Sequence, residues 1–297
     1  MILVAGGTGR LGAMVVRHLV DQGLAVRVLT RDPARAGRLF ADRVDVCHGD
    51  VRDRSSLLPA LRDVQVVLCA VHGFGGSQGQ SPATVDRDGN ANLVDVAKHA
   101  GADVVLMSVV GAAPDSPVEL FRMKHAAEQH LLASGVSATI VRATAYLELW
   151  IEILTGTVDR SGRPLVFGRG ENPINFVSVV DVAALVERAI TDHALRGTAL
   201  EIGGPKNLTF NQLASAVAAA AGSTRPPRHL PPPVLRVLAG TAGRVRPGLG
   251  AQLRAALDLD SADHTFDAAG HRQLYPDLPV TSLEAALATS PWGVATR

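Results

Sequence analysis

The first twelve residues constrain the fold of this chain most strongly. The apolar run Ile2–Ala5 predicts a short buried strand, and the amphipathic pattern over Arg10–Val20 predicts a helix. Between them, Gly6, Gly9 and Gly12 predict a tight turn. Glycines in such a turn let backbone N–H groups approach a diphosphate at a helix N-terminus, where unpaired donors and the helix dipole favour an anion. Because glycine also serves ordinary turns, the nucleotide interpretation depends on the rest of the chain.

Length and composition limit the class of protein. A chain of 297 residues, 47% hydrophobic and 19% charged, is long enough for one large domain with a substantial core. The net charge is only +1, so we expect a small-molecule substrate and no nucleic acid or membrane partner, with the chain a monomer or homodimer. No signal-peptide layout precedes the first strand, and no apolar run reaches the roughly 18 residues that span a bilayer, which favours a cytoplasmic protein.

The end of the second predicted strand, residues 25–30, indicates which dinucleotide the turn would hold. An acid at this place binds the ribose 2′-hydroxyl of NAD, whereas a basic residue accommodates the 2′-phosphate of NADP. The chain has Arg31 there, with Arg35 and Arg10 also available, so NADP(H) is the preferred cofactor. The alternative is that these arginines are solvated surface charges. The neighbouring Asp32 keeps NAD(H) open.

Strands and helices alternate regularly through the first half of the chain. The predicted elements are, in order, a strand at 44–50, a helix at 55–61, a strand at 64–71, a helix at 86–100 and a strand at 103–107. A glycine-rich stretch at 72–82 follows one of these strands, in the place where open α/β sheets bind ligands. The alternation predicts an α/β fold with a Rossmann-type doubly wound parallel sheet. Cys47 and Cys69 each fall in a predicted buried strand, so we expect reduced structural thiols.

The order and spacing of the motifs resemble those of an atypical short-chain dehydrogenase/reductase of the NmrA-like, NAD(P)H-binding group. The resemblance covers about residues 1–222. The motifs that carry it are Gly6–Gly12, Thr30–Pro33, Gly49–Asp50, Gly89–Asp95, Ser108, Lys124–Leu131, Thr139–Arg142, Phe176–Ala183 and Ile202–Pro205.

The resemblance implies roles for the residues at matching positions. These are Gly6, Thr8, Gly9, Arg10, Leu11 and Gly12 at the diphosphate, Arg31 at the 2′-phosphate, Asp50 and Val51 at the adenine, Ala70, Val71, His72 and Ser108 at the ribose and nicotinamide, and Lys124 as a hydrogen-bond donor to the nicotinamide ribose. The alternative for Lys124 is a solvated lysine on a helix.

The proton donor of related reductases is missing from this sequence. A typical short-chain reductase has a tyrosine four residues before the lysine, with a pKa lowered by the ammonium group. In this chain the position holds Leu120, followed by Phe121, and neither can transfer a proton. The candidate substitutes are His72, Tyr146 and Lys124; His72 is otherwise a loop histidine and Tyr146 a packing residue. A quinone, whose reduced product is an acidic hydroquinone, needs little acid catalysis.

Other chemistries are disfavoured by spacing. Helical residues five apart, such as His125 and His130, project about 140° apart, so with Glu128 they do not predict a metal site. The glycine turn lacks the Gly-Lys-Ser/Thr ending of a P-loop. Ser108 is not in a Gly-x-Ser-x-Gly elbow, which disfavours a serine hydrolase.

The second half of the chain predicts an addition to the dinucleotide fold. We expect residues 1–222 to form the NAD(P)-binding Rossmann domain, with interleaved segments of a small C-terminal substrate lobe from about residue 143, and 223–297 to be a C-terminal helical extension of the same domain. Within that extension, 225–233 predicts a stiff proline-rich connector and 239–250 a flexible, locally basic loop.

Two helix starts are predicted in the second half. Asp181 and Thr209 each fit the N-cap of a following helix, so a structural role for Asp181 is favoured over a catalytic one.

These observations lead to two hypotheses of function. The first is an NADPH-dependent oxidoreductase that reduces a small apolar or aromatic carbonyl, quinone or conjugated acceptor without the usual tyrosine. The second is a non-catalytic NADP(H)-binding sensor that regulates a partner. A third hypothesis, an epimerase or dehydratase, is disfavoured, because related enzymes use the tyrosine that this chain lacks.

Overall fold

A computed structural model of the protein describes residues 1–74, 79–245 and 247–289. The chain separates into two compact units. The first is Met1–Ala143 with Val182–Glu201, and the second is Thr144–Asp181 with Ile202–Arg297. The domain boundaries expected from the sequence stay a prediction.

The first unit is built on a seven-stranded sheet in the order β10-β6-β5-β4-β1-β2-β3. The strands are β1 Ile2–Ala5, β2 Val26–Thr30, β3 Asp45–His48, β4 Val66–Cys69, β5 Asp103–Val109, β6 Ala138–Ala143 and β10 Ala199–Ile202. β1 pairs in parallel with both β2 and β4, so that Ile2 lies opposite Val26 and Val66. The strand order reverses at β1, and the predicted Rossmann-type doubly wound sheet is confirmed.

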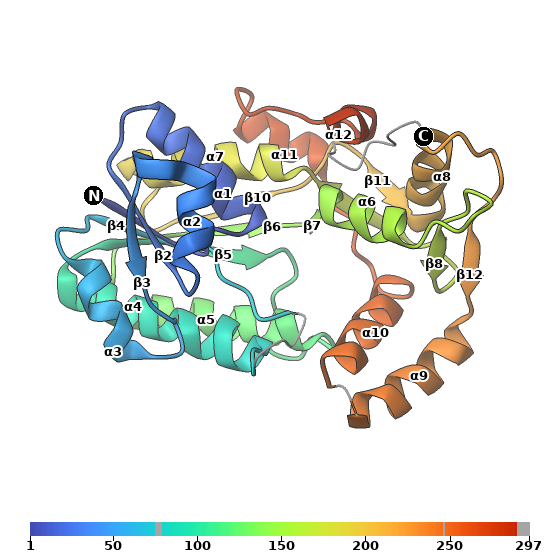
Figure 1. Ribbon diagram of the computed structural model, residues 1–297, viewed down its shortest axis with the longest axis horizontal. Coiled ribbons are helices and arrows are strands. Elements are labelled where there is room, and N and C mark those ends of the chain that lie inside the picture. The colour runs from blue at the N-terminus through green and yellow to red at the C-terminus, as the bar shows by residue number, and fades with distance from the viewer. Residues whose placement is uncertain (75–78, 246, 290–297) are drawn as a thin grey trace. The chain divides into compact units, whose positions relative to one another are not determined.

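Helices cover both faces of this sheet. They are α1 Arg10–Asp21, α2 Pro33–Phe40, α3 Arg54–Leu57, α4 Asp88–Ala100, α5 Glu119–Ser134 and α7 Val179–Thr191. Figure 1 shows α1 and α7 on one face and α4 and α5 on the other. Every residue of β1 and of β4 is buried, which explains why both strands are continuous apolar runs and do not alternate.

The helix predicted from residue 86 begins earlier than expected. A π-helical turn over Pro82–Arg87 precedes α4. Ser81 caps this turn, because its hydroxyl accepts from the Thr84 N–H (3.2 Å) and the Thr84 hydroxyl accepts from the Ser81 N–H (3.0 Å). This capping box has threonine at the position where glutamate or glutamine is usual. The start of the helix at residue 82 is therefore not evident from the sequence.

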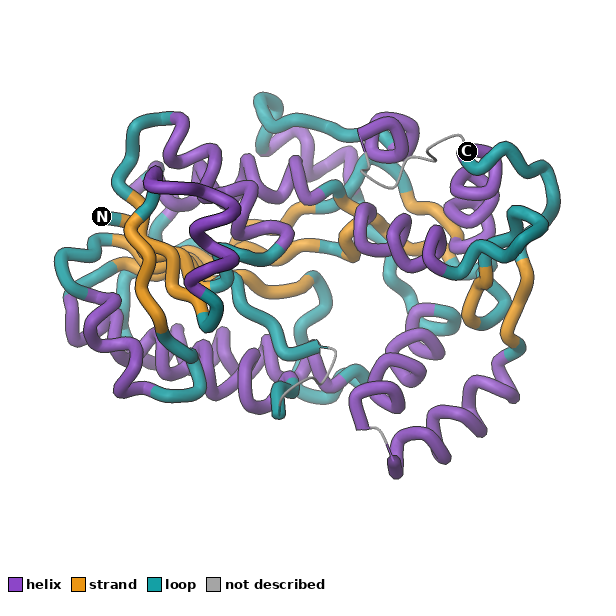
Figure 2. Tube along the Cα trace, viewed as in Figure 1, coloured by secondary structure: helices purple, strands orange, loops and turns teal. Residues whose placement is uncertain are grey.

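The second unit contains short strands between helices, as the colours of Figure 2 show. Its strands are β7 Ala145–Tyr146, β8 Leu165–Phe167, β9 Pro173–Val177, β11 Asn207–Thr209 and β12 Arg228–Leu230. Its helices are α6 Leu147–Gly156, α8 Phe210–Ala220, α9 Pro232–Val245, α10 Pro247–Leu259, α11 Ala268–Leu274 and α12 Leu283–Thr289. The core of this unit includes Phe176 and Phe210. Their ring centroids lie 5.5 Å apart in an edge-to-face arrangement.

The predicted loop at 239–250 is wrong for the residues that the structure describes, because they lie in α9 and α10; residue 246 is outside the described residues. A glycine costs a helix only about 1 kcal/mol relative to alanine, and packing offsets that cost. Leu235 and Ala239 of α9 pack with Leu253 of α10 in a buried cluster. The predicted connector at 225–233 also contains β12, which pairs in parallel with β8.

The predicted N-cap at Thr209 is confirmed and the one at Asp181 is wrong. Thr209 caps α8, as predicted, by accepting from the Gln212 N–H at 3.1 Å. Asp181 is not the N-cap of α7, because the helix begins at Val179; the Asp181 carboxylate instead accepts from the Thr281 N–H (2.9 Å) and hydroxyl (2.6 Å). Both cysteines are free thiols, but Cys47 in β3, at the edge of the sheet, is only half-buried.

Candidate functional site

The glycine turn joins β1 to α1 in the first unit. Gly6 has φ +89°, and a Cβ built on it would overlap the carbonyl oxygen of Ala70. A Cβ on Gly12 would overlap the Gly6 carbonyl oxygen. Gly9 is the N-cap of α1 and supplies no side-chain cap. The Ala13 N–H donates to the Gly9 carbonyl (2.9 Å), so the N–H groups of the three residues before Ala13 have no acceptor within the helix.

The side chains of the other turn residues lie in different surroundings. Leu11 is buried, Thr8 is half-buried and Arg10 is exposed. The buried Leu11 side chain packs in the core, so only the backbone of this residue is available to a ligand.

Arg31 directly follows β2 and is exposed. Within the described part of the chain, its guanidinium makes no hydrogen bond. The adjacent Asp32 is the N-cap of α2 and accepts from the Arg35 N–H at 2.9 Å. Asp32, the acid that made NAD(H) an alternative cofactor, therefore caps a helix, whereas the exposed Arg31 is available to bind an anion.

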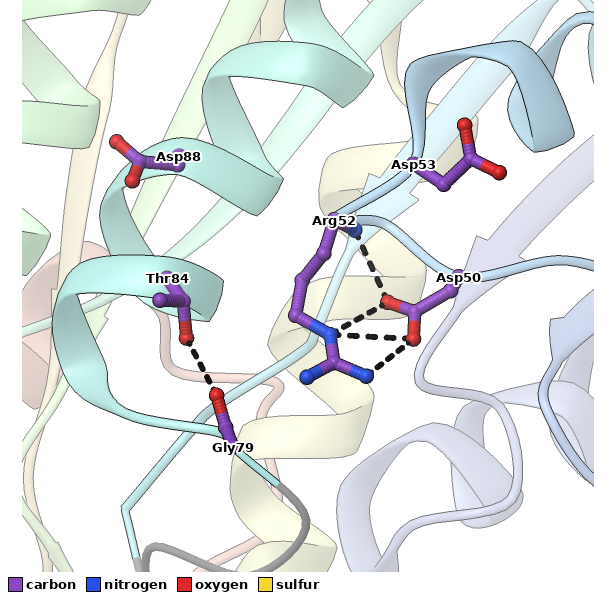
Figure 3. A pocket seen from close by; sticks show the side chains of 6 residues that line it. All are labelled: Asp50, Arg52, Asp53, Gly79, Thr84 and Asp88. Carbon is purple, nitrogen blue, oxygen red and sulfur yellow. Dashed lines mark hydrogen bonds and ion pairs between the residues drawn. The ribbon is translucent and has the colours of Figure 1, made fainter.

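The Asp50 carboxylate is held by Arg52 after β3 (Figure 3). The Arg52 Nε lies 3.0 and 3.1 Å from the two carboxylate oxygens, Nη2 lies 2.6 Å from Oδ2, and the Arg52 N–H donates to Oδ1 at 3.0 Å. These hydrogen bonds lower the pKa of Asp50 against the effect of partial burial, and the charge of Arg31 adds to the lowering. A role for Arg52 was not predicted from the sequence. The only sequence signal for this role is that Arg52 lies two residues after Asp50.

This ion pair borders a cavity of about 410 Å³ (Figure 3). The cavity is lined by Asp50, Arg52, Asp53, Gly79, Thr84 and Asp88. Val51 does not line it, because its buried side chain packs so close to Gly89 of α4 that a Cβ there would lie 2.6 Å from Val51 Cγ2. Residues 75–78 of the predicted ligand-binding stretch lie outside the described residues.

Lys124 of α5 is buried where β4 and β5 end. Its ammonium group lies 3.2 Å from the Val71 carbonyl oxygen, 3.1 Å from the Met107 carbonyl oxygen and 3.0 Å from Asp86 Oδ1. Asp86 Oδ2 accepts from the Gly73 N–H at 2.8 Å. The sequence predicts Asp86 only as the start of a helix, because nothing near it in the chain indicates a contact with Lys124 of another helix.

The other residues expected at the nicotinamide end lie after β4 or within β5. Ala70 and Val71 follow β4 and are half-buried, whereas His72 is exposed. Protein atoms around the imidazole lower the pKa of His72 by desolvation; the Asp86 carboxylate opposes this effect and the Lys124 charge adds to it. Ser108 of β5 is buried, and its hydroxyl has no hydrogen-bond partner among the described residues. Such a hydroxyl is available to a ligand, since leaving it unpaired is costly.

Tyr146 belongs to the second unit, where it pairs with Val177 of β9. Burial raises the pKa of its phenol, and the charge of Glu148 raises it further. Its hydroxyl is therefore a weaker acid than that of an ordinary tyrosine.

His130 and Glu128, which were considered as metal ligands, each contact a side chain of opposite charge type. His130 lies 2.8 Å from Asp95, and Glu128 accepts from Arg142 at 2.7 Å. Across residues 1–74, 79–245 and 247–289, no cluster of three potential metal ligands occurs. In the same ranges, no helix has the length and apolar character needed to cross a membrane.

Comparison with known proteins places these features in context. A model of the NmrA-like family matches residues 1–273. The chain is 32% identical over 232 residues to an NAD(P)H azoreductase of Xenophilus azovorans, a match that covers 77% of this chain and 76% of that protein. It is 25% identical over 224 residues to quinone oxidoreductase 2 of Escherichia coli strain K12, covering 75% of each.

A solved structure extends the likeness to the whole fold. The crystal structure of an NADPH-dependent quinone oxidoreductase from Escherichia coli, complexed with NADPH, superposes with a TM-score of 0.77 at 22% identity. The match covers 96% of this chain and 98% of that one. At this identity it shows a shared fold.

Proposed function

The chain belongs to the NmrA-like family, and from this premise we propose that it uses NADPH to reduce small apolar or aromatic acceptors. Its relatives are named an NAD(P)H azoreductase and quinone oxidoreductase 2, and the solved structure of similar fold is named an NADPH-dependent quinone oxidoreductase. The acceptor classes proposed are carbonyls, quinones and conjugated double bonds.

The groups of the first unit fit NADPH. The N–H groups at the start of α1 point toward the turn and suit the diphosphate, and the close approaches at Gly6 and Gly12 keep side chains out of the turn. The exposed guanidinium of Arg31 suits the 2′-phosphate. Asp50 and Val51 are proposed to flank the adenine.

At the other end of the cofactor, Ala70, Val71, His72 and Ser108 are proposed to flank the ribose and nicotinamide. The unpartnered hydroxyl of Ser108 is suited to bond a ligand there. When bound, the nicotinamide supplies the hydride, and the residues of the chain bind and orient it.

Protonation by the protein favours some acceptors over others. The lowered pKa of His72 leaves its imidazole mostly neutral at neutral pH, and the raised pKa of Tyr146 makes its phenol a poor donor. The Lys124 ammonium group already donates to the Val71 and Met107 carbonyl oxygens and is ion-paired with Asp86. We therefore favour acceptors, such as quinones, whose reduced form is a weak base and needs little help from a protein acid.

The proposal rests mainly on one observation. The glycine turn before α1 has no room for side chains at Gly6 and Gly12, and the guanidinium of Arg31 after β2 is exposed and makes no hydrogen bond with the described residues. The test is to incubate the purified protein with NADPH and a panel of quinones, azo compounds, aldehydes, ketones and enones, and to follow the loss of NADPH absorbance. We expect oxidation that depends on the acceptor, fastest with quinones. No oxidation with any of the panel would overturn the proposal of a reductase.

A sensor of NADP(H) is the second candidate, because Leu120 replaces the usual tyrosine and Lys124 is engaged internally. Calorimetry with NADPH and NADP⁺ separates the two functions. Tight binding of both without turnover, together with a partner that responds to the ligand, favours the sensor.

A further inference from the structure

The helix α9 carries a further inference, because one of its two apolar faces is uncovered. On the covered face, Leu235 and Ala239 pack with α10 in a buried cluster. On the other face, Val234, Val237 and Leu238 are 43%, 65% and 39% exposed. Because residues three and four apart lie on the same side of a helix, these three side chains form one aliphatic stripe. A contiguous exposed apolar patch of this kind marks a binding surface.

The stretch of chain that contains α9 and α10 is strongly basic. Residues 202–257 hold seven of the 29 Lys and Arg residues and none of the 28 Asp and Glu residues. The net charge of +1, from which no membrane partner was expected, is therefore the sum of a basic stretch and an acidic remainder. An anionic partner is complementary to this stretch.

Two of these basic residues lie on the helices themselves. Arg236 of α9 and Arg254 of α10 are exposed, and neither guanidinium makes a hydrogen bond or ion pair with another described residue. By contrast, Arg228 is already paired with Asp159 at 3.0 Å. Figure 1 shows α9 and α10 alongside each other, so the stripe and the two guanidinium groups belong to one pair of packed helices.

We propose that α9 and α10 dock the protein on the surface of an anionic phospholipid bilayer. The aliphatic stripe enters the boundary between headgroups and acyl chains, and the long side chains of Arg236 and Arg254 reach the phosphates. Amphipathic helices with basic polar groups bind membranes in this way without crossing them. The proposal agrees with the finding that no helix in the described ranges could span a bilayer.

The chemistry of α9 favours lipid over other anionic partners. The dominant contacts of protein interfaces are enriched in aromatic side chains, and single-stranded nucleic acid stacks on aromatic rings. Residues 232–245 of α9 include no aromatic residue. A second copy of the chain that docked through the same stripe would bring Arg236 near its own counterpart, where like charges repel. A bilayer requires only aliphatic area and positive charge.

Docking on a membrane would bring the proposed reductase close to its acceptors, since apolar quinones leave water for the bilayer. Only this benefit rests on the proposed function. The docking itself is argued from the stripe and the arginines.

Co-sedimentation of the full chain with vesicles tests the proposal. The vesicles contain either phosphatidylcholine alone or an equal mixture of phosphatidylcholine and the anionic phosphatidylglycerol. We expect binding to the mixed vesicles and at least about fivefold weaker binding to the neutral ones, because basic residues are attracted to an anionic surface. At about 1 M salt the Debye length falls to about 3 Å, so binding to the mixed vesicles should weaken at least about fivefold.

Two variants test the two parts of the surface. Val237→Asp removes an aliphatic side chain from the stripe and Arg236→Glu reverses a charge, and each should weaken binding to the mixed vesicles at least about fivefold. The matched controls are Leu132→Asp on α5, where the leucine is 64% exposed, and Arg17→Glu on α1, where the arginine is exposed. Both controls should bind as wild type does. If Val237→Asp fails to fold, Arg236→Glu decides the test.

The proposal is overturned if the protein does not bind the mixed vesicles, binds both kinds of vesicle equally, or loses as much binding in the controls as in the two variants. A dimer that Val237→Asp dissociates in light scattering, without vesicle binding, would assign the stripe to a second copy of the chain instead. The vesicle test needs neither NADPH nor an acceptor, so it can succeed when the proposed reductase fails. Conversely, a protein that does not bind vesicles can still reduce a water-soluble benzoquinone.

Discussion

Lys124 Nζ lies 3.0 Å from Asp86 Oδ1, and the two side chains are only 6% and 0% exposed. Charges taken out of water depend on one another, because an unpaired buried ion is far costlier than a buried pair. The pair joins α5 to the π-helical turn before α4, and Lys124 also donates to the carbonyl oxygens of Val71, after β4, and Met107, in β5.

This relationship predicts a large stability loss for a single substitution. Lys124→Met should lower the free energy of unfolding by about 3–5 kcal/mol, since it leaves the Asp86 carboxylate buried without a partner. Urea denaturation followed by circular dichroism measures the change. Lys98→Met is the control, because the Lys98 ammonium bonds the Ser134 carbonyl at the surface, and its loss should cost less than about 1 kcal/mol. A change below about 1 kcal/mol for Lys124→Met would show that the carboxylate is not stranded.

The glycine turn predicts a steric effect on cofactor binding. In Gly12→Ala, the new methyl group overlaps the Gly6 carbonyl oxygen and forces the turn apart, so NADPH should bind at least about tenfold more weakly. Calorimetric titration measures the affinity. Gly37→Ala in α2 meets nothing within 4 Å and should leave binding unchanged, with stability equal or slightly higher. Equal affinities for Gly12→Ala and wild type would place the diphosphate elsewhere.

Arg31 predicts selectivity between the two dinucleotides. Arg31→Ala should weaken NADPH binding by about 10- to 100-fold, as expected for the loss of a charged hydrogen bond worth about 1.5–3 kcal/mol, and should leave NADH binding nearly unchanged. The ratio of dissociation constants is the measurement. Arg38→Ala on the exposed side of α2 is the control and should not alter the ratio. Equal losses for both dinucleotides would remove Arg31 from the 2′-phosphate.

The Asp50–Arg52 pair predicts a pH effect of defined sign. Because the folded pKa of Asp50 is lowered from the ordinary 3.8, its contribution to stability is present above that value and is lost as pH falls through the folded pKa. In Arg52→Gln the pKa of Asp50 should rise, and the variant should differ from wild type more at about pH 6 than at a pH below the folded pKa of Asp50, where the carboxyl group is protonated in both proteins. Carboxyl NMR titration and urea denaturation at both pH values measure the two effects.

The control for this pair is Arg62→Gln, which changes an exposed arginine. It should leave the pKa of Asp50 where it is. An Asp50 titration that is the same in wild type and Arg52→Gln would mean that the hydrogen bonds between the two residues do not govern the carboxyl group.

Much of the fold, including the glycine turn and the place of Arg31 that we propose for the phosphates, could be predicted, because the signals are local. A buried parallel strand is an apolar run, and the turn after β1 needs glycine at Gly6 and Gly12 because backbone atoms occupy the place of a side chain. Arg31 is likewise fixed by its position directly after β2. Each of these signals lies within a few residues of sequence.

The missed features depend on contacts between distant segments. Nothing near Asp86 indicates that it meets Lys124, since the sheet and two helices bring them together. The end of α9 and the start of α10 were predicted as a loop at 239–250, because the glycines there outweighed, in the sequence, the packing of Leu235 and Ala239 with Leu253. Arg52 was missed because its turn directs the guanidinium back onto Asp50, a choice that spacing alone does not fix.

A kinetic measurement on the wild-type protein tests the proposed reductase activity most directly. NADPH oxidation is followed under anaerobic conditions with a simple benzoquinone as acceptor, in parallel with the same reaction started with NADH. We expect acceptor-dependent oxidation of NADPH that saturates in both reactants and is slower with NADH. A protein that neither binds NADPH in calorimetry nor oxidises it with any quinone would contradict the proposed NADPH-dependent reductase.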